Sequence, residues 1–365
     1  MKIVQAVHLF PPQIGGVERH TYELCKDLAE MRENVIVHTT GKPGKEKDPF
    51  EVKRHWGLKT PFFSSVVWIP FLSIRLMMEN ADIYASHGYG SLMPVCTALA
   101  AMVKRKPFVL TVHGYPQLSG FARIAQWIYR NTFARFVLWR ADKVIVVSRE
   151  SKKYLEGQVD RKKLVYIPNG VDTKMFKCPS FTEGEYISYI GRVDKDKRVG
   201  MLINALGKMK EKQKLLVAGN DEGGRPGLRK LAKNLGLDAE FTQVVPEEVA
   251  QIYCYSKAVV LPSRYEGFSL VWLEAMAAGR PMFSTPVGQA PELFREVYGK
   301  DAEKFLFPDE EGLIDRLEYF VKNEKEFVNI VEKAKKKVAK DYSWKAMAEK
   351  TLDVYEAAIK GKKKN

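Results

Sequence analysis

The chain has 365 residues, which is more than one ordinary hydrophobic core accommodates, and this length predicts two domains. Hydrophobic residues make up 45% and charged residues 28%, as in folded globular proteins, which argues against a disordered chain. The formal net charge is +15, and residues 1–172 carry +10 of it, with 25 Lys and Arg against 15 acidic residues. This bias is compatible with nucleic acid, an anionic membrane or a phosphorylated substrate, and also with plain solubility.

The N-terminal sequence and the cysteines predict a cytoplasmic protein. The chain begins directly with a strand-like run, MKIVQAVHLF, and no small-residue cleavage site follows it. The longest apolar stretch, residues 61–78, is interrupted by Pro70 and Arg75, so it is not expected to span a membrane. The cysteines have no C-x-x-C motif and no histidine at ligand spacing, so we expect reduced structural thiols. They are Cys25, Cys96, Cys178 and Cys254.

Strand-like runs alternate with helix-like runs along the chain, which predicts an α/β fold with parallel sheets covered on both faces. In the first half, strands are expected near residues 3–9, 35–39, 82–86, 108–112, 144–147 and 165–167. In the second half, they are expected near residues 187–190, 215–218, 241–245, 258–261, 282–284 and 305–307. An aperiodic segment between Asp172 and Glu185 separates two Rossmann-like domains, residues 1–172 and 173–343.

One stretch, residues 261–281 (LPSRYEGFSLVWLEAMAAGRP), joins an apolar strand to a helix through a polar loop. Ser269 is the expected N-cap, and the helix should end before Gly279. In open α/β sheets, ligands bind at the carboxyl ends of strands. The amides of residues 267–270 would form a helix N-terminus suited to an anion or a sugar hydroxyl.

Two acids, Glu266 and Glu274, stand eight positions apart in this stretch. A carboxylate among so many apolar residues is unusual unless a partner pairs with it, although two solvated surface carboxylates are the plainer alternative. The spacing E-x7-E inside EGFSLVWLEAMAAGRP resembles the signature of retaining nucleotide-sugar glycosyltransferases with the GT-B fold, known as glycosyltransferases group one and glycosyltransferase family four.

This resemblance implies two Rossmann-like domains that face each other across a cleft, with the last helix, in residues 344–365, crossing back onto the first domain. It implies transfer of a hexose from a nucleotide diphosphate sugar to an acceptor hydroxyl, with retention of configuration, no cofactor and no metal. Retention by double displacement would need a carboxylate nucleophile, which the sequence does not single out, so front-face attack is favoured.

The first strand leads into a glycine loop, FPPQIGGVERH, at the ligand side of the sheet. Gly15 and Gly16 let the backbone approach a ligand closely, and the family's glycine loop lies at this position. By the resemblance, the amide of Gly16 contacts the donor phosphate or the acceptor. Glu18 is expected to face the acceptor, although an acid in the first turn also stabilises the helix.

Two histidines, His87 in ASHGYG and His113 in TVHGYP, each follow a strand. TVHG resembles the family's active-site histidine segment, which implies that His113 contacts the sugar, and His87 is expected on the acceptor side. Metal ligation is not expected, because no third ligand is spaced to complete a site.

The second domain opens with YIGRVDKDKRV, in which Arg192 and Lys197 follow a strand. A guanidinium and an ammonium can neutralise a leaving diphosphate without a metal, and both match the family's diphosphate-binding residues. Asp194 and Asp196 spell D-x-D but lie inside this phosphate loop, so we do not expect a cation there. The resemblance also implies that Val245 lies beside the nucleotide base.

These matches give each site residue an expected role. Glu266 and the amides of Gly267 and Phe268 would hold the sugar, and Glu274 would accept the ribose hydroxyls. The catalytic residues are Glu266, His113, Arg192 and Lys197; the donor-binding residues are Gly15, Gly16, Arg192, Lys197, Val245, Glu266, Gly267, Phe268, Ser269, Leu270 and Glu274; and the acceptor-binding residues are Glu18 and His87.

The acceptor is expected to be a lipid-linked sugar, a lipid or a glycan, reached through peripheral contact with an anionic membrane. Basic clusters at residues 104–106 and 161–163, and the apolar residues 62–78, motivate this expectation. A GT-B epimerase or phosphorylase remains an alternative. A basic nucleic-acid-binding protein is another, but it predicts stacking platforms or a recognition helix that are not apparent.

Overall fold

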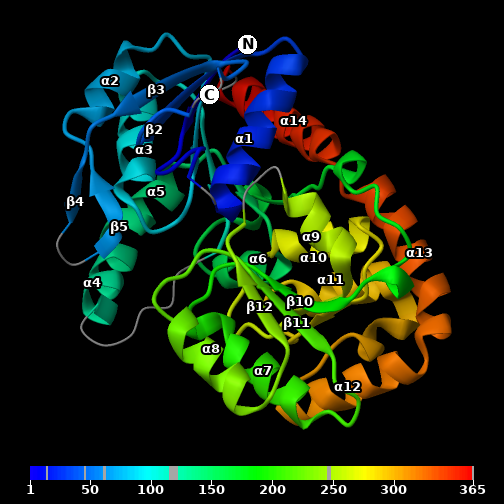
Figure 1. The fold of residues 1–365 in the computed structure, drawn as a ribbon. Coiled ribbons are helices and arrows are strands. Elements are labelled where there is room, and N and C mark those ends of the chain that lie inside the picture. The colour runs from blue at the N-terminus through cyan, green and yellow to red at the C-terminus, as the bar shows by residue number, and fades with distance from the viewer. Residues whose placement is uncertain (14, 45–46, 61–62, 115–121, 245–247, 364–365) are drawn as a thin grey trace. The chain divides into compact units, whose positions relative to one another are not determined.

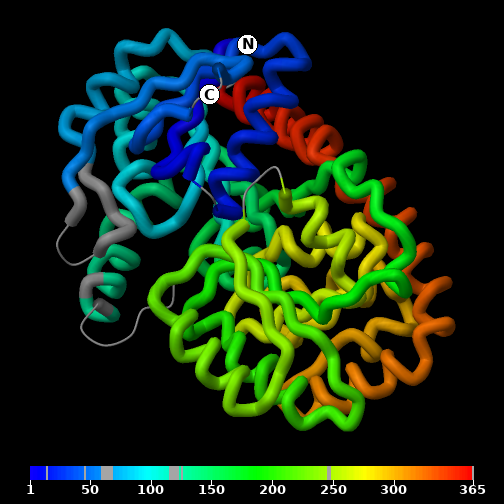
Figure 2. Tube along the Cα trace, viewed as in Figure 1, coloured from blue at the N-terminus to red at the C-terminus, as the bar shows by residue number. Residues whose placement is uncertain are grey.

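The computed structural model describes residues 1–13, 15–44, 47–60, 63–114, 122–244 and 248–363. The chain divides into two compact units (Figures 1 and 2). Unit 1 is Met1–Gly170 together with Trp344–Asn365, and unit 2 is Val171–Ser343. Each unit is built around a sheet of parallel strands with helices packed on it, as the alternating pattern predicts.

The sheet of unit 1 has seven parallel strands in the order β3-β2-β1-β6-β7-β8-β9. Its central strands consist mostly of buried aliphatic residues, so their sequences are nearly continuous apolar runs. A separate antiparallel pair, β4 and β5, precedes α2. The strands are β1 Lys2–Ala6, β2 Asn34–Thr40, β3 Glu51–His55, β4 Leu58–Thr60, β5 Phe63–Trp68, β6 Ile83–His87, β7 Phe108–Val112, β8 Lys143–Val146 and β9 Leu164–Tyr166.

The helices of unit 1 include the C-terminal helix, which lies against α1 (blue and red in Figure 1). Gln5 on β1 donates a hydrogen bond to the Tyr355 hydroxyl on that helix at 2.9 Å, so residues 350 positions apart meet in the core. The helices are α1 Gly16–Glu30, α2 Leu72–Met78, α3 Leu92–Val103, α4 Ala122–Tyr129, α5 Arg135–Arg140, α6 Arg149–Leu155 and α14 Trp344–Lys363, with a π-helical turn Arg130–Ala134 between α4 and α5.

The sheet of unit 2 has five parallel strands in the order β12-β11-β10-β13-β14. The strands are β10 Tyr186–Ile190, β11 Lys214–Ala218, β12 Ala239–Thr242, β13 Ser256–Leu261 and β14 Met282–Ser284. The sixth strand predicted here, residues 305–307, is wrong as a full strand, because this segment forms only an isolated bridge from Leu306 to Ser284.

The helices of unit 2 cover both faces of its sheet (Figure 1). They are α7 Val199–Lys208, α8 Arg225–Asn234, α9 Val249–Tyr255, α10 Leu270–Ala277, α11 Ala290–Tyr298, α12 Glu310–Lys322 and α13 Glu324–Asp341. Across the described residues of both units, no helix combines the length and the apolar content needed to cross a membrane.

Two of the four cysteines correct a sequence prediction. Cys178 and Cys254 form a disulfide, with their Cα atoms 4.8 Å apart, so the prediction of a reduced thiol is wrong for this pair. Their 76-residue separation hid the pairing, because the fold, and not a local motif, brings α9 beside the segment that precedes β10. Cys25 and Cys96 are free thiols, as expected.

Candidate functional site

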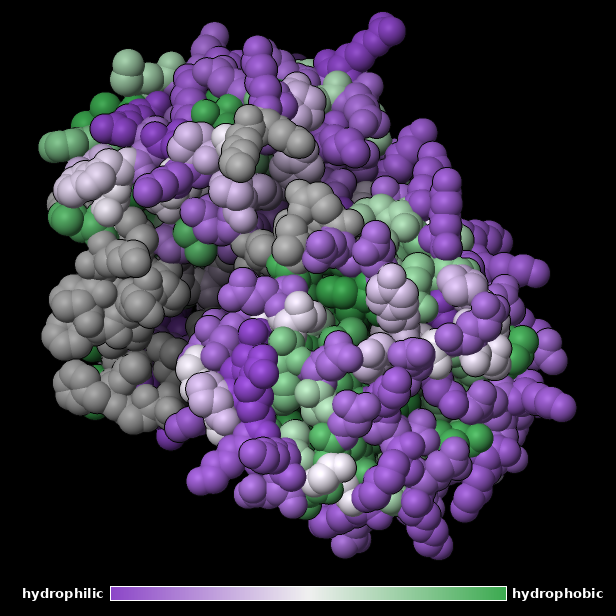
Figure 3. All heavy atoms as spheres, in the orientation of Figure 1, coloured by the Kyte–Doolittle hydropathy of each residue, from purple (hydrophilic) through white to green (hydrophobic). Residues whose placement is uncertain are grey.

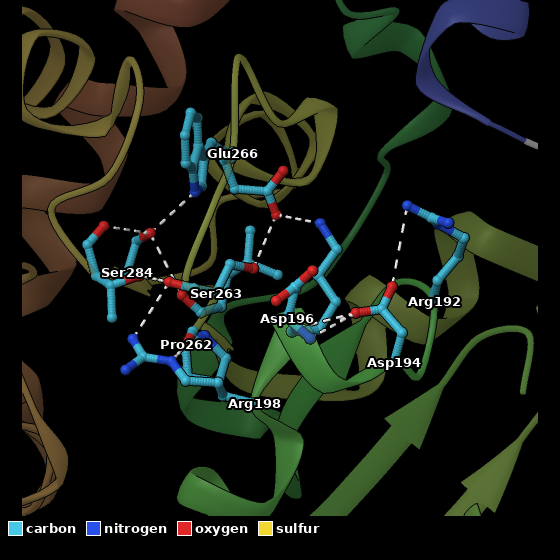
Figure 4. Close-up of polar contacts among 12 residues, drawn as sticks. Arg192, Asp194, Asp196, Arg198, Pro262, Ser263, Glu266 and Ser284 are labelled. Carbon is cyan, nitrogen blue, oxygen red and sulfur yellow. Dashed lines mark hydrogen bonds and ion pairs between the residues drawn. The ribbon is translucent and has the colours of Figure 1, made fainter. Parts of the chain in front are cut away.

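Two loops of unit 2 meet because the strands that precede them, β10 and β13, are neighbours in the sheet. The backbone N–H of Arg264 donates to the Asp196 carbonyl at 2.7 Å. The Arg198 side chain donates from Nε to the Pro262 carbonyl at 2.8 Å (Figure 4). These bonds hold the phosphate loop expected at residues 191–198 against the loop that carries Glu266, at the carboxyl edge of the sheet.

Lys197 and Glu266 form the centre of this arrangement. Lys197 Nζ donates to Glu266 Oε1 at 2.6 Å, and Ser263 Oγ donates to the same oxygen at 2.8 Å. The Lys197 and Glu266 side chains are only 16% and 12% exposed, so their ion pair is less screened than a surface pair. Among the described residues, none donates a hydrogen bond to Glu266 Oε2, which therefore remains an available acceptor.

Arg192 lies in the same loop but is more exposed, at 57% of its side chain. Its guanidinium pairs with Glu222 at 3.1 Å and lies 3.9 Å from Asp194 (Figure 4). Asp194 also caps the short helical turn Lys195–Lys197, because its Oδ1 accepts from the backbone N–H groups of Asp196 and Lys197. The first acid of the D-x-D pattern thus shapes the loop that presents Lys197.

The Glu266 loop is also held by a tight turn that the sequence did not single out as part of the site. Gly288 has a φ of +56°, and a Cβ there would lie 2.1 Å from the Glu266 carbonyl oxygen. Gln289 donates its backbone N–H to the Gly267 carbonyl at 3.0 Å. Position 288 therefore requires glycine for two reasons, a left-handed backbone and the close approach of the Glu266 backbone.

Helix α10 begins after Ser269, as predicted, and Ser269 makes no side-chain cap bond. The donor-binding role expected of residues 267–270, at the N-terminus of this helix, stays a prediction. Glu274 lies on α10, where its Oε2 accepts from the Tyr253 hydroxyl at 2.7 Å. Burial, followed by the nearby Glu274, raises the pKa of Tyr253 well above its usual value, so this phenol remains a hydrogen-bond donor.

The described residues of unit 1 bring three histidines together. His87 Nδ1 lies 3.2 Å from His113 Nε2, and the ring of His20, on α1, packs edge-on to both. The sequence showed no third ligand spaced to complete a site with His87 and His113, and the fold places His20 beside them. His20 gave no sequence signal, because α1 lies far from both strands in the chain and only the folded sheet places it there.

Burial lowers the pKa of each of these histidines, for His20 to about 4 and for His87 and His113 well below the usual value. Neighbouring histidines add to the effect on His87 and His113. The three rings are therefore neutral at pH 7, because an imidazolium would lose its hydration in this surrounding. The predicted contact of His113 with a sugar stays a prediction.

The two glycines of the loop before α1 differ in how much space a side chain would have at each position. A Cβ at Gly15 would lie 2.1 Å from the Glu18 carboxylate, which folds back over the start of the helix. A Cβ at Gly16 would meet no atom within 4 Å. The Glu18 carboxylate is the end of a flexible side chain that can move aside, so crowding explains neither glycine, and the ligand-facing roles of Gly15 and Gly16 stay predictions. Val245 lies outside the described residues.

Two family profiles together cover most of the chain. Residues 14–175 match Glycosyltransferase Family 4, and residues 171–337 match Glycosyl transferases group 1. The chain is 26% identical over 368 residues to the gpi3 subunit of phosphatidylinositol N-acetylglucosaminyltransferase from Schizosaccharomyces pombe, covering 95% of this chain and 79% of that protein. It is also 26% identical over 373 residues to the sulfoquinovosyl transferase SQD2 of Arabidopsis thaliana, covering 95% and 71%.

Among solved structures, the fold is similar to Anabaena Alr3699/HepE in complex with UDP and glucose. The two superpose with a TM-score of 0.81 over 98% of this chain and 100% of that one, at 18% identity. A likeness at this identity concerns the fold, and both units of the present chain take part in it.

Proposed function

Because the chain belongs to the GT-B glycosyltransferases of the group 1 and family 4 type, we propose that it moves a hexose from a nucleotide diphosphate sugar to an acceptor hydroxyl, with retention of configuration. The family and the two-domain GT-B fold expected from the sequence are confirmed. One observation supports the donor assignment most strongly: Lys197, Arg192 and Glu266 converge at the carboxyl edge of the unit 2 sheet.

The two cations would stabilise the leaving nucleoside diphosphate, whose negative charge grows as the bond to the sugar breaks. Lys197 is already held in place by its bond to Glu266, so little reorganisation is needed when a phosphate arrives. Arg192 is more exposed and would exchange Glu222 for a phosphate oxygen, to which a guanidinium can donate two hydrogen bonds.

Glu266 would hold the sugar through Oε2, while Lys197 and Ser263 bind Oε1. A carboxylate that is fixed in an ion pair is a weak nucleophile, which supports front-face attack over double displacement. In front-face attack, the acceptor oxygen bonds to the anomeric carbon as the phosphate oxygen leaves, and that phosphate oxygen takes the acceptor's proton. Glu274, oriented by Tyr253, would accept the ribose hydroxyls.

The acceptor is proposed to be a lipid-linked sugar, a lipid or a glycan, presented at an anionic membrane surface. Support comes from an apolar surface that we call the α2–α3 patch: Phe71, Ile74, Met78, Met102 and Val103 are all exposed, and α2 packs on α3. Lys104, Arg105 and Lys106 follow directly. Figure 3 shows hydrophobic side chains among hydrophilic ones at its upper left, where Figure 1 has α2. One relative's name also includes phosphatidylinositol.

The test is an assay of nucleotide release from UDP-, GDP- and ADP-linked hexoses, with and without a membrane extract as the source of acceptor. UDP sugars come first, because the similar Anabaena structure holds UDP. We expect release that depends on the acceptor and a product whose anomeric configuration, read by NMR, equals that of the donor. An epimerase would instead alter the donor sugar without an acceptor, and a phosphorylase would require inorganic phosphate.

We also propose that no divalent cation is needed at the diphosphate, since Arg192 and Lys197 supply the positive charge. Turnover should be the same with and without added Mg²⁺ or Mn²⁺. A strict requirement for either ion would show that the two side chains do not suffice.

A further inference from the structure

We propose that unit 1 contains a transition-metal site, suited to Zn²⁺, formed by His20, His87 and His113. The cluster has one potential ligand nitrogen from each residue, and these atoms all lie within 4.8 Å of one another. The three side chains come from α1 and from the carboxyl ends of β6 and β7. The cluster belongs to unit 1 alone, and its capacity to bind a metal is independent of the transfer reaction.

The distances suit a small ion with imidazole ligands. A Zn–N bond of about 2.0–2.1 Å with tetrahedral angles places two ligand nitrogens about 3.3 Å apart. His87 Nδ1 and His113 Nε2 are already 3.2 Å apart. The other pairs, within 4.8 Å, would close by at most about 1.5 Å when a metal binds.

Side-chain amides fix which ring nitrogens face inward. Gln5 donates from Nε2 to the Tyr355 hydroxyl, so its Oε1 must be the atom that accepts from His87 Nε2, at 3.0 Å. The lone pair of His87 then lies on Nδ1, the atom nearest His113. On His20, Nδ1 donates to Asn169 Oδ1 at 2.8 Å, which leaves the lone pair on Nε2. An outer hydrogen bond that sets tautomer and orientation is the usual support of a metal-binding histidine.

The surroundings also suit a metal. His20 and His87 are almost fully buried, whereas His113 is partly exposed among the described residues. Three histidine ligands leave the fourth position of a tetrahedral ion for water or another small ligand.

A chain of hydrogen-bonded histidines is the competing explanation. In that state, His113 carries its proton on Nε2 and donates it to His87 Nδ1. Metal binding would require the proton of His113 to reside on Nδ1 instead. This is a change of tautomer, so no net proton is lost and no other reactant is required.

The test uses the full-length chain, stripped of metal and then titrated with Co²⁺ and Zn²⁺. Co²⁺ in a site of this kind gives intense visible absorption bands, which a hydrogen-bonded histidine cluster does not produce. His20→Asn and His87→Gln are suitable variants, because each keeps an N–H donor for its amide partner and removes the ligand nitrogen. His8→Gln is the control, since His8 lies outside the cluster.

We expect the wild-type chain and His8→Gln to bind one equivalent of Co²⁺, displaceable by Zn²⁺, and to gain thermal stability from Zn²⁺ by mass action. In His20→Asn and His87→Gln, the affinity should fall at least about tenfold, the range associated with loss of a metal ligand or its support. Absence of the cobalt bands from the folded wild-type chain, or equal bands in all four proteins, would overturn the proposal.

Discussion

The position of the Lys197 side chain depends on several other residues of unit 2. Asp194 caps the turn that carries it, and Glu266 with Ser263 fixes its ammonium from the neighbouring loop. A glycine at 288 in turn allows the Glu266 loop to pack closely. The position of the cation is therefore set before any ligand arrives, which is the condition under which charge stabilises a transition state most effectively.

Replacement of the two cations tests this role directly. Arg192→Ala and Lys197→Ala should each lower turnover by about tenfold to a hundredfold or more, since loss of one donor to a developing anion costs about 3 kcal/mol. Lys195→Ala is the matched control, because Lys195 is exposed in the same turn. The measurement is kcat on chains whose circular dichroism matches the wild type. Near-normal turnover in both variants would remove the phosphate assignment.

The two glutamates should differ in which kinetic constant they affect. Glu274→Gln should mainly raise KM for the donor, because a ribose contact is made equally in the ground state and the transition state. Glu266→Gln should mainly lower kcat, because it weakens the pairing with Lys197 next to the reacting sugar. Tyr253→Phe should follow Glu274→Gln, since its hydroxyl orients that carboxylate. The opposite pattern of KM and kcat would exchange the two roles.

At the scale of elements, the sequence predicted the apolar strands well and missed a polar edge strand. Residues 108–112 were expected as a strand and are β7, and residues 282–284 were expected as a strand and are β14, which lies at the edge of its sheet. β3 was missed because EVKRH is polar and partly exposed at the sheet edge, where no apolar run is needed. The predicted strand at 305–307 was wrong because the segment is apolar and buried without forming a strand. A short apolar run alone does not distinguish a strand from another buried segment.

The candidate site was also only partly predictable from the sequence. Residues in loops that follow a strand, such as Arg192 and Glu266, could be proposed from the sequence, because parallel topology places these loops at one edge of the sheet and the family resemblance suggested their roles. His20, Tyr253 and Gly288 were missed. Each acts through a contact between elements that are distant in sequence, and no spacing rule reports such a contact.

The disulfide gives an element-scale prediction. Under denaturing conditions without reductant, a thiol reagent should find two free cysteines, Cys25 and Cys96, and after reduction it should find four. Closing a 76-residue separation should stabilise unit 2 by up to about 4–5 kcal/mol through the unfolded chain. Reductant should therefore lower the Tm of the wild type and of Cys96→Ser, but not that of Cys178→Ser. Four accessible thiols before reduction would refute the bond.

At the scale of the whole molecule, the net positive charge and the exposed apolar residues both favour contact with an anionic membrane. Residues 1–172 carry +10, and the α2–α3 patch exposes Phe71 at 73% and Met78 at 80%. The basic residues 104–106 follow Val103, a residue of this patch, in the chain. Apolar side chains that enter the interface and cations that attract anionic headgroups reinforce each other, because each cation near such a surface contributes about 1 kcal/mol. A few contacts of each kind suffice for reversible attachment.

Co-sedimentation with liposomes tests this attachment. The chain should pellet with anionic vesicles at low salt and much less at high salt, because the Debye length falls from about 10 Å at 0.1 M to about 3 Å at 1 M. Neutral vesicles should bind it weakly at both salt concentrations. Phe71→Ser with Met78→Ser should reduce binding to anionic vesicles, whereas Tyr255→Ser, an exposed aromatic position in unit 2, should not. A chain that stays in the supernatant with anionic vesicles at low salt would rule out the membrane contact. It would leave the transferase assignment intact, since the proposed diphosphate-binding residues Arg192 and Lys197 lie in unit 2.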